Sequence, residues 1–424
     1  MKTIPQLYPF TRASTRFRWL IFTGLSLVIL LAAAACKLSG GGGSSKEQET
    51  VMQFLGYIPD KPEYRQWTSY GDSAAWYASW NVPRVYSLDE VNALDDTSWA
   101  YWMGMMLSQT YPPDCLDLNY ILGPSYSLRD EFGFDMFDMD RFIFAGSPPK
   151  VLSVMEFSID RKRIEDALAE KGYTAKDYGD GWVLYSLGED YKINSQAKTN
   201  AERLGNLNRI LLSDHFMIVG KATEVVEAGL EAHDKKAPTL AGNKTYSASV
   251  QALYDSSLKD VGELVGVMWI GGSEFTSLPA SFESFTQEQV QQMREDYGLN
   301  TDLPEFTLAA FATRHSQEKG ATYLILALVF PKGTDTEEAA RVLEERLENG
   351  YSLRNRVPFL EAMRTTDVNT YAVQAGGLPV TLTVFRLDDP ELTTSGGFER
   401  PMGRVRAWME FVVSRDLLFL YTGP

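Results

Sequence analysis

The sequence predicts an α+β protein built from two similar units, with an aromatic-rich helical segment at its N-terminal side. Each unit is expected to be a mostly antiparallel sheet with helices on one face. A seven-residue pattern occurs twice, at 129–135 (RDEFGFD) and at 294–300 (REDYGLN). Each copy leads into an apolar run of strand length. Strand-like runs then follow one another in pairs instead of alternating strictly with helices, which favours antiparallel sheets.

Two further pairs of segments keep the same order along the chain. Residues 170–173 have a counterpart at 348–351, each at the end of a helical segment where Gly is expected to form the left-handed cap. Residues 212–220 have a counterpart at 413–421. Three landmarks in one order indicate an internal duplication, with convergent α/β patterning as the alternative.

The N-terminus has the pattern of a bacterial export signal. Residues 1–18 carry four cationic side chains and no acids, and residues 19–35 are apolar or small. We therefore interpret 1–35 as a signal peptide. The Gly- and Ser-rich stretch that follows predicts a flexible tether over 36–50, with structured sequence starting near Val51.

The position of Cys36 resembles the lipobox of bacterial lipoproteins, although Ala33 stands where Leu is usual. The resemblance implies that Cys36 is diacylated, becomes the mature N-terminus and anchors the protein to the lipid bilayer. An uncleaved N-terminal membrane anchor and ordinary cleavage after Ala35 are the alternatives. All three place the folded part outside the cytoplasm, on the outer face of the membrane, because the positive flank stays inside.

Composition limits the classes of partner and cofactor. The formal net charge is −16, and loss of the four N-terminal cations makes the mature chain −20. This acidity disfavours nucleic acid as a partner. Lipid on Cys36 would leave Cys115 without a partner for an intramolecular disulfide. Three scattered histidines in no metal-binding motif predict no metal site, and no motif predicts a cofactor.

Aromatic residues concentrate between residues 51 and 128. Two helices are expected there, at 73–80 and 96–109. One interpretation is a stacking platform for a sugar, another small molecule or a protein. Its candidate residues are Trp67, Trp76, Trp80, Trp99 and Trp102. The alternative is a helical layer that packs over the sheets.

The two units are expected at 51–240 and 241–424, with the boundary at 237–243. Acidic residues at 130–140 predict a solvated turn before a strand. In the first unit the expected strands are 142–145, 151–159, 182–187 and 210–220, the last with a break expected at Asp214. The expected helices are 161–171 and 223–232. In the second unit the expected helices are 246–258, 287–297 and 336–349, and the expected strands are 261–270, 306–311, 323–330, 370–374, 380–387 and 417–421. Strands 370–374 and 380–387 are expected to form a hairpin around Gly376 and Gly377.

No sequence motif establishes an enzyme. The nucleophile elbow, the phosphate loop and the dinucleotide fingerprint are missing, and the Ser256-x-x-Lys259 pair lacks the Lys-Thr-Gly strand of penicillin-recognising enzymes. We therefore expect an extracytoplasmic, membrane-anchored lipoprotein that acts as a non-catalytic binding or scaffold protein. The alternatives are a solute-binding lipoprotein of a transporter and a cell-envelope hydrolase that uses carboxylates or Ser256.

Overall fold

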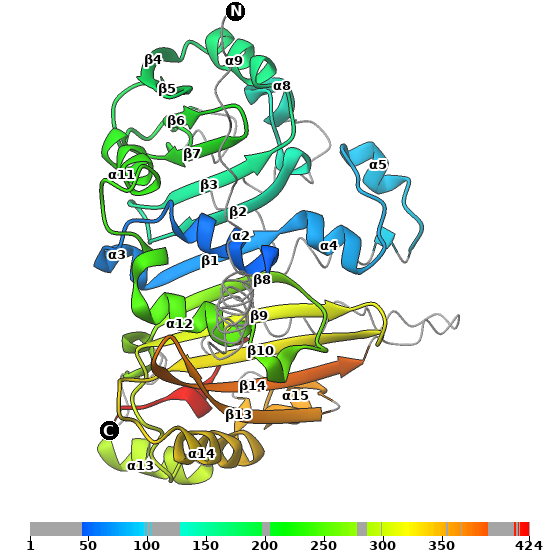
Figure 1. Cartoon of the computed structure of the whole chain (residues 1–424), viewed down its shortest axis with the longest axis vertical. Helices are drawn as coiled ribbons and strands as arrows, with labels where there is room; N and C mark the ends of the chain where they lie inside the picture. Colours follow the sequence, from blue (N-terminus) through cyan, green and yellow to red (C-terminus); the bar gives the residue numbers. More distant parts are fainter. Residues whose placement is uncertain are drawn as a thin grey trace, which may run out of the picture. The chain divides into compact units, whose positions relative to one another are not determined.

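One antiparallel sheet of twelve strands forms the centre of the structure (Figure 1). The structure is a computed structural model, and it describes residues 45–96, 98–99, 102, 128–196, 204–277, 286–297, 299–352, 355–365, 367–388, 411–412, 414 and 416–423. The predicted signal peptide and Cys36 lie outside these ranges. Within them, no helix combines the length and the apolar character that crossing a membrane requires.

The strands confirm the predicted α+β class. They are β1 (Trp67–Asp72), β2 (Met139–Ala145), β3 (Leu152–Phe157), β4 (Thr174–Gly179), β5 (Trp182–Ser186), β6 (Arg209–Leu212), β7 (Phe216–Gly220), β8 (Glu263–Gly271), β9 (Leu308–Ser316), β10 (Ala321–Val329), β13 (Asp367–Ala375) and β14 (Leu378–Asp388). Their order across the sheet is β13-β14-β10-β9-β8-β1-β2-β3-β7-β6-β5-β4. The short strands β11 (Tyr351–Ser352) and β12 (Val357–Pro358) form a separate pair.

Helices cover both faces of the sheet, so the prediction of helices on one face only was wrong. The described α-helices are α2 (Lys46–Leu55), α3 (Pro62–Arg65), α4 (Ser73–Ser79), α5 (Leu88–Asn92), α8 (Leu128–Phe132), α9 (Arg161–Glu170), α11 (Thr223–His233), α12 (Lys244–Leu253), α13 (Gln287–Asp296), α14 (Thr336–Asn349) and α15 (Phe359–Met363). One face packs against α2, α11 and α12 in a single apolar cluster. The opposite face carries two clusters, one with α4 and α9 over the first strands and one with α14 and α15 over the last.

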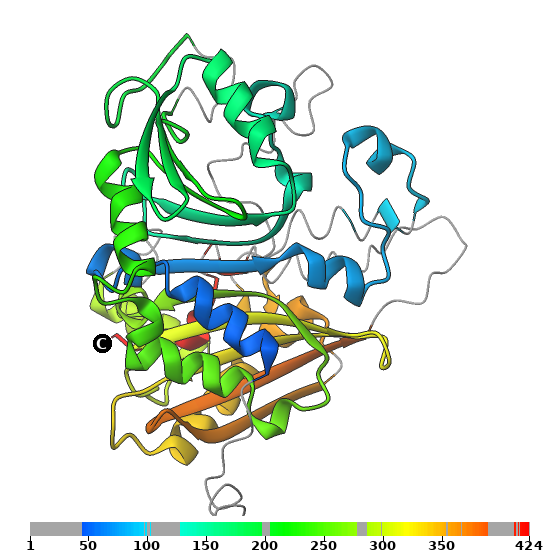
Figure 2. The same cartoon turned by 45° about the horizontal axis from the view of Figure 1, so that its top comes forward.

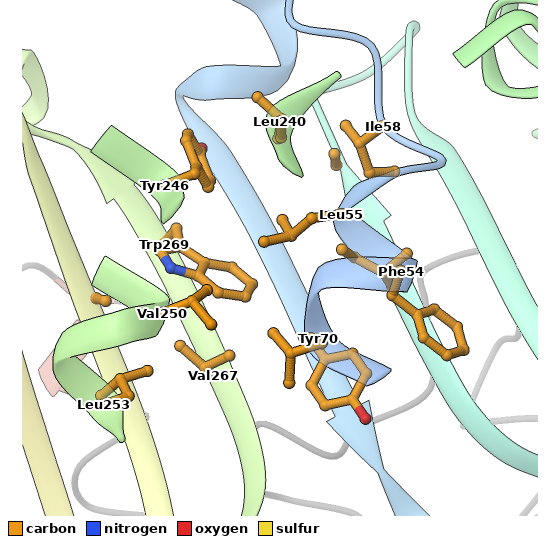
Figure 3. Packing of buried hydrophobic residues seen from close by; sticks show 14 of the residues in the cluster. Phe54, Leu55, Ile58, Tyr70, Leu240, Tyr246, Val250, Leu253, Val267 and Trp269 are labelled. Carbon is orange, nitrogen blue, oxygen red and sulfur yellow. The ribbon is translucent and has the colours of Figure 1, made fainter. Parts of the chain in front are cut away.

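The α2–α12 side of the sheet shows how sequence periodicity becomes a core. Figures 2 and 3 show the two helices over β1 and β8, with Leu55 and Val250 directed toward the strands. Trp269 of β8 is fully buried between them, and its indole N–H donates to the Ser249 hydroxyl at 2.9 Å. Burial of these side chains is the main favourable term for this layer, at about 25 cal/mol per Å² of apolar surface.

The two predicted units share one sheet instead of forming two. Strands β1 and β8 pair antiparallel at its centre, from Trp67 opposite Ile270 to Gly71 opposite Gly266. Counted outward from this pair, the first half places β1, β2, β3, β7 and β6, and the second half places β8, β9, β10, β14 and β13. The order agrees at five positions, and the first half then adds β5 and β4. Agreement in strand order does not show a common origin, so the duplication stays a proposal.

Several local predictions are confirmed. The hairpin of β13 and β14 turns at Gly376 and Gly377, whose φ values of 58° and 75° fit a two-residue turn. The predicted break near Asp214 separates β6 from β7. The predicted end of the tether at residue 50 was wrong, because helical structure starts at Lys46, five residues before the expected Val51.

Other predictions were wrong. No strand was expected in the aromatic-rich segment, but residues 67–72 form β1, the strand next to the centre of the sheet. The polar strand β4 was not expected, because it lies at the sheet edge with an exposed side-chain pattern. Residues 418–420 form a 3-10 helix in place of the final strand. The reason is that the buried Arg346 donates to the carbonyl oxygens of Phe419 and Tyr421.

The two landmark glycines end their helices differently. Gly172 has a φ of +86°, as the predicted left-handed cap requires. Gly350 has an extended conformation, with φ −65° and ψ 151°, so the prediction of a left-handed cap was wrong there. A Cβ at Gly350 would lie 2.6 Å from the carbonyl oxygen of Arg346. Gly350 is therefore needed because the Arg346 carbonyl oxygen lies too close for a Cβ, and not because the chain makes a left-handed turn there.

Candidate functional site

Helix α4 brings Trp76 and Trp80 together. Asp72 caps the helix by accepting the N–H of Ala75 at 2.8 Å. The two tryptophans are four residues apart, and their rings stack with centroids 3.9 Å apart. The Trp80 ring also stacks on His315 of β9, at 4.0 Å. This stack attaches the aromatic segment to a strand of the second half.

The five predicted ligand-binding tryptophans do not form one platform. Trp76, Trp80 and Trp102 share one apolar cluster and expose 0%, 7% and 1% of their surface. Trp99 is half-buried beside that cluster, whereas Trp67 is half-buried beside the cluster under α14. A buried ring offers no face to a ligand, so the packing alternative fits Trp76, Trp80 and Trp102. Ligand binding at Trp67 and Trp99 stays a prediction.

A charged network at one end of the central strands was not predicted from the sequence. Asp72 is the last residue of β1 and lies opposite Arg141 of β2. The Arg141 guanidinium donates to Asp72 at 2.7 Å and to Glu156 of β3 at 2.8 Å. Burial opposes the charge of Arg141, but the two carboxylates outweigh burial and raise its pKa. Arg141 therefore stays charged and connects three strands.

Arg314 of β9 is the centre of a second charged group. Its guanidinium donates to the carbonyl oxygens of Gly262 at 2.6 Å and of Leu253 at 3.0 Å. The guanidinium also lies over the ring of Tyr254, 4.7 Å from the ring centroid. A carboxylate oxygen of Glu47 lies 3.5 Å from it. Arg314 thus holds the end of α12 and the residue before β8 through its two terminal nitrogens.

Glu47 connects α2 to the same place. Its carboxylate accepts the N–H of Leu264, the second residue of β8, at 2.6 Å. Burial raises the pKa of Glu47, and the charge of Arg314 opposes this shift. Glu47 and Arg314 therefore join α2 of the first half to β8 and β9 of the second, whereas Arg141 joins β1, β2 and β3 within the first half.

Sequence reasoning missed this network because its members are far apart in the chain. Asp72 precedes a predicted helix, so its capping role could be read from the sequence. Its partner Arg141 lies 69 residues away. Only the pairing of β1 with β2 brings the two side chains together, and β1 itself was not recognised.

The first copy of the repeated pattern forms a second charged cluster. Arg129 donates to Asp135 at 3.1 Å and to Asp138 at 3.0 Å, and Arg163 of α9 donates to Asp138 at 3.0 Å. This segment was predicted to be a solvated turn, but Asp135 and Asp138 are buried. The arginines neutralise the acids and so permit their burial. Burial and the neighbouring Asp138 carboxylate raise the pKa of Asp135 to about 6.

The second copy of the pattern uses its arginine in a similar way. Arg294 forms an ion pair with Asp302 and donates to the carbonyl oxygens of Leu299 at 3.4 Å and Gly423 at 3.2 Å. Asp302 follows Arg294 by eight residues, and Asp138 follows Arg129 by nine. In both copies, therefore, an arginine within a helix bonds to the loop that follows that helix.

The remaining candidate groups lie apart. His233 stacks on Tyr57 at 4.4 Å, and His215 is exposed between β6 and β7. Over the part of the chain that the structure describes, no group of three or more His, Cys, Asp or Glu could hold a metal ion. Ser256 and Lys259 are exposed at a short 3-10 turn.

No protein-family description and no curated protein matches the chain. The chain has a structural likeness to crystal form IV of TP0453, a Treponema lipoprotein. The match covers 80% of this chain and 95% of that chain, with 8% sequence identity and a TM-score of 0.31. A likeness at this TM-score carries no argument about fold or function.

Proposed function

We propose that this chain is an extracytoplasmic, membrane-anchored lipoprotein whose folded part acts as a non-catalytic binding or scaffold protein. The export pattern and the position of Cys36 support the anchor. The observation that carries the rest is the two charged groups around Arg141 and Arg314, whose arginines donate to carboxylates and main-chain carbonyls of neighbouring elements. Arg141 connects three strands of the first half, and Glu47 with Arg314 connects α2 to the second half, which are structural roles.

The solute-binding alternative receives less support. It expects a ligand cleft between the halves, as such sites favour interdomain positions. Here β1 and β8 pair along Trp67–Gly71 and Gly266–Ile270, so backbone hydrogen bonds join the halves along this line. We therefore propose that binding uses an outer surface of the sheet or its edges.

We also propose that the halves arose by duplication, with units at 51–240 and 241–424. The five matching strand positions and the similar roles of Arg129 and Arg294 support this. Co-expressed fragments 36–240 and 241–424 should then reassemble through β1 and β8. If the two fragments fail to reassemble, and the protein folds only as one covalent chain, that result would count against the division into units.

Labelling with a fatty-acid analogue tests the anchor. The parent should incorporate the label and partition into detergent. Cys36→Ser should lose both properties, and Cys115→Ser, the matched control, should keep both. Labelling that persists in Cys36→Ser would refute the lipoprotein proposal.

The non-catalytic part of the proposal needs its own test. Ester, peptide and glycoside substrates should be hydrolysed at background rates. Hydrolysis above background that disappears in Ser256→Ala, with an unchanged thermal midpoint, would support the hydrolase alternative. Ser257→Ala is the neighbouring control, because its hydroxyl is also exposed.

A further inference from the structure

The two edges of the sheet are built differently. The edge strand β4 is short, carries Lys176 and Asp177, and has a register shift between Asp177 and Gly179. Charges, bulges and short length are devices that keep other strands away from an edge. The opposite edge strand, β13, has nine residues, pairs with β14 without a register shift, and carries one charge, at Asp367. By these criteria β4 is protected against further pairing and β13 is not.

The outward groups of β13 follow from its hairpin. The two-residue turn makes Ala375 and Leu378 a hydrogen-bonded pair, so hydrogen-bonded and non-hydrogen-bonded pairs alternate along the strand. Pro379, which has no N–H, falls at a non-hydrogen-bonded position. The residues that direct N–H and C=O groups away from β14 are therefore Val368, Thr370, Ala372 and Gln374. Among the described residues, no hydrogen bond reaches these outward main-chain groups.

In the first half, another strand occupies the position that corresponds to the outer edge of β13. There β6, which corresponds to β13 in the strand order, pairs antiparallel with β5. Strand β5 belongs to the β4–β5 hairpin that follows α9. In the second half a hairpin, β11–β12, also follows the corresponding helix α14, but it forms its own two-stranded sheet. Among the strands that the structure describes, none takes beside β13 the position that β5 fills beside β6 (Figure 1).

We propose that the outer edge of β13 binds an extended segment of another protein, which pairs antiparallel with β13 and carries basic residues on either side of an uncharged centre. This inference rests on the proposed binding or scaffold function and names its surface. Main-chain pairing supplies the affinity, as in other cases of strand addition to a sheet edge. The small side chains of Thr370 and Ala372 leave the edge accessible, and Tyr371, which is 36% exposed, would gain a cross-strand contact.

Charge next to the edge selects the kind of partner. Helix α14 packs on β13 and contains five glutamates, Glu337, Glu338, Glu344, Glu345 and Glu348. Its two arginines are Arg341 and the buried Arg346. This surplus of acid attracts Lys or Arg beside the bound strand. A second copy of this chain would instead bring a second acidic α14 close to the first, so the observations favour a basic partner over self-association.

A synthetic peptide can test the edge in the full chain. The probe is the β5 sequence, Trp182–Ser186, with two lysines added at each end. It should bind saturably and slow amide exchange at Val368, Thr370, Ala372 and Gln374. Ala372→Pro removes one outward N–H and leaves the β14 ladder intact, so binding should weaken about tenfold or more. Ala372→Thr keeps the N–H and should bind like the parent.

Two further probes keep the test independent of how Ala372→Pro folds. A peptide N-methylated at alternate residues should not bind, and one with aspartates in place of the lysines should bind more weakly at low salt. The proposal would be overturned if the peptide slowed amide exchange only in β4 or in elements other than β13. It would also be overturned if the methylated peptide bound as well as the unmethylated one. Dimers in sedimentation that dissociate in Ala372→Pro would assign the edge to a second copy and also overturn it. If Cys36 is labelled and no hydrolysis is found, but the peptide does not bind, this inference fails while the proposed function stands.

Discussion

The guanidinium of Arg346 donates to the carbonyl oxygen of Tyr421 at 2.6 Å, although Arg346 exposes only 1% of its surface. It also donates to the carbonyl oxygens of Thr301 at 2.7 Å and Phe419 at 3.3 Å. Burial, and secondarily the charge of Arg294, lower the pKa of Arg346 to about 10. The group remains charged at neutral pH and connects α14 to the C-terminal segment.

Loss of this cation should destabilise the protein. Arg346→Met would leave three buried carbonyl groups without their donor, and we expect the free energy of unfolding to fall by about 2–3 kcal/mol. Urea denaturation would measure the change. Amide exchange at residues 418–420 should also accelerate, because the segment loses its attachment.

Arg341→Met on the same helix is the matched control. Arg341 is exposed and pairs with Glu338 and Glu345 at the surface. Exposed ion pairs contribute little to stability, so its unfolding midpoint should stay close to that of the parent. Equal losses in the two variants would show that the buried carbonyl contacts of Arg346 are not what stabilises the segment.

Local patterns were sufficient to predict much of the fold. Gly376 and Gly377 between two apolar runs predicted the β13–β14 hairpin, and Ser73 after Asp72 predicted the start of α4. Strand β1 was missed because its residues, WTSYGD, are mixed in polarity, and its burial depends on neighbours on both sides. Edge strand β4 was missed because its side chains are mostly exposed, so its sequence shows no alternation of apolar and polar residues.

The candidate site depended almost entirely on long-range pairing. Arg141 meets Asp72 and Glu156 only because β1, β2 and β3 are neighbours. The tryptophans illustrate a second difficulty. A cluster of aromatic residues has the same sequence pattern whether it faces a ligand or a core, and only tertiary packing distinguishes Trp76 from Trp99.

The landmark glycines should respond differently to the same substitutions. At Gly172, where no atom lies within 4 Å of an added Cβ, Ala should cost about 1–2 kcal/mol because of the left-handed φ, and Asn should cost less. At Gly350 an added Cβ meets the Arg346 carbonyl, so Ala and Asn should both cost about 1–3 kcal/mol. Urea denaturation of the four variants measures this. An advantage of Asn over Ala at Gly350 would contradict the contact argument.

Acrylamide quenching should separate the tryptophans. Trp99→Phe removes a half-buried ring and should reduce the quenchable fraction of the emission, whereas Trp76→Phe removes a buried ring and should leave that fraction almost unchanged or slightly higher. Trp67→Phe should behave like Trp99→Phe. Strong quenching that is lost in Trp76→Phe would mean that the α4 stack opens to solvent. That result would support the interpretation of these tryptophans as a stacking platform for a ligand.

Stability should depend on pH through Asp135. Its pKa is raised to about 6 in the folded chain, mainly by burial, against about 4 in an unfolded chain. Between these values the folded state binds more protons than the unfolded state, so this carboxyl contributes stability at low pH that is lost as pH rises through 6. The loss is on the order of 2 kcal/mol.

Asp135→Asn removes this titration while keeping an oxygen that can accept the N–H of Phe137, which Asp135 accepts at 2.9 Å. The variant should therefore gain stability relative to the parent as pH rises from about 4 to about 7.5, whatever its stability at the lower limit. Urea denaturation at steps across this range measures the difference between the two proteins. A difference that stays constant, or that shrinks with rising pH, would mean that the arginines around Asp135 outweigh its burial and hold it ionised throughout.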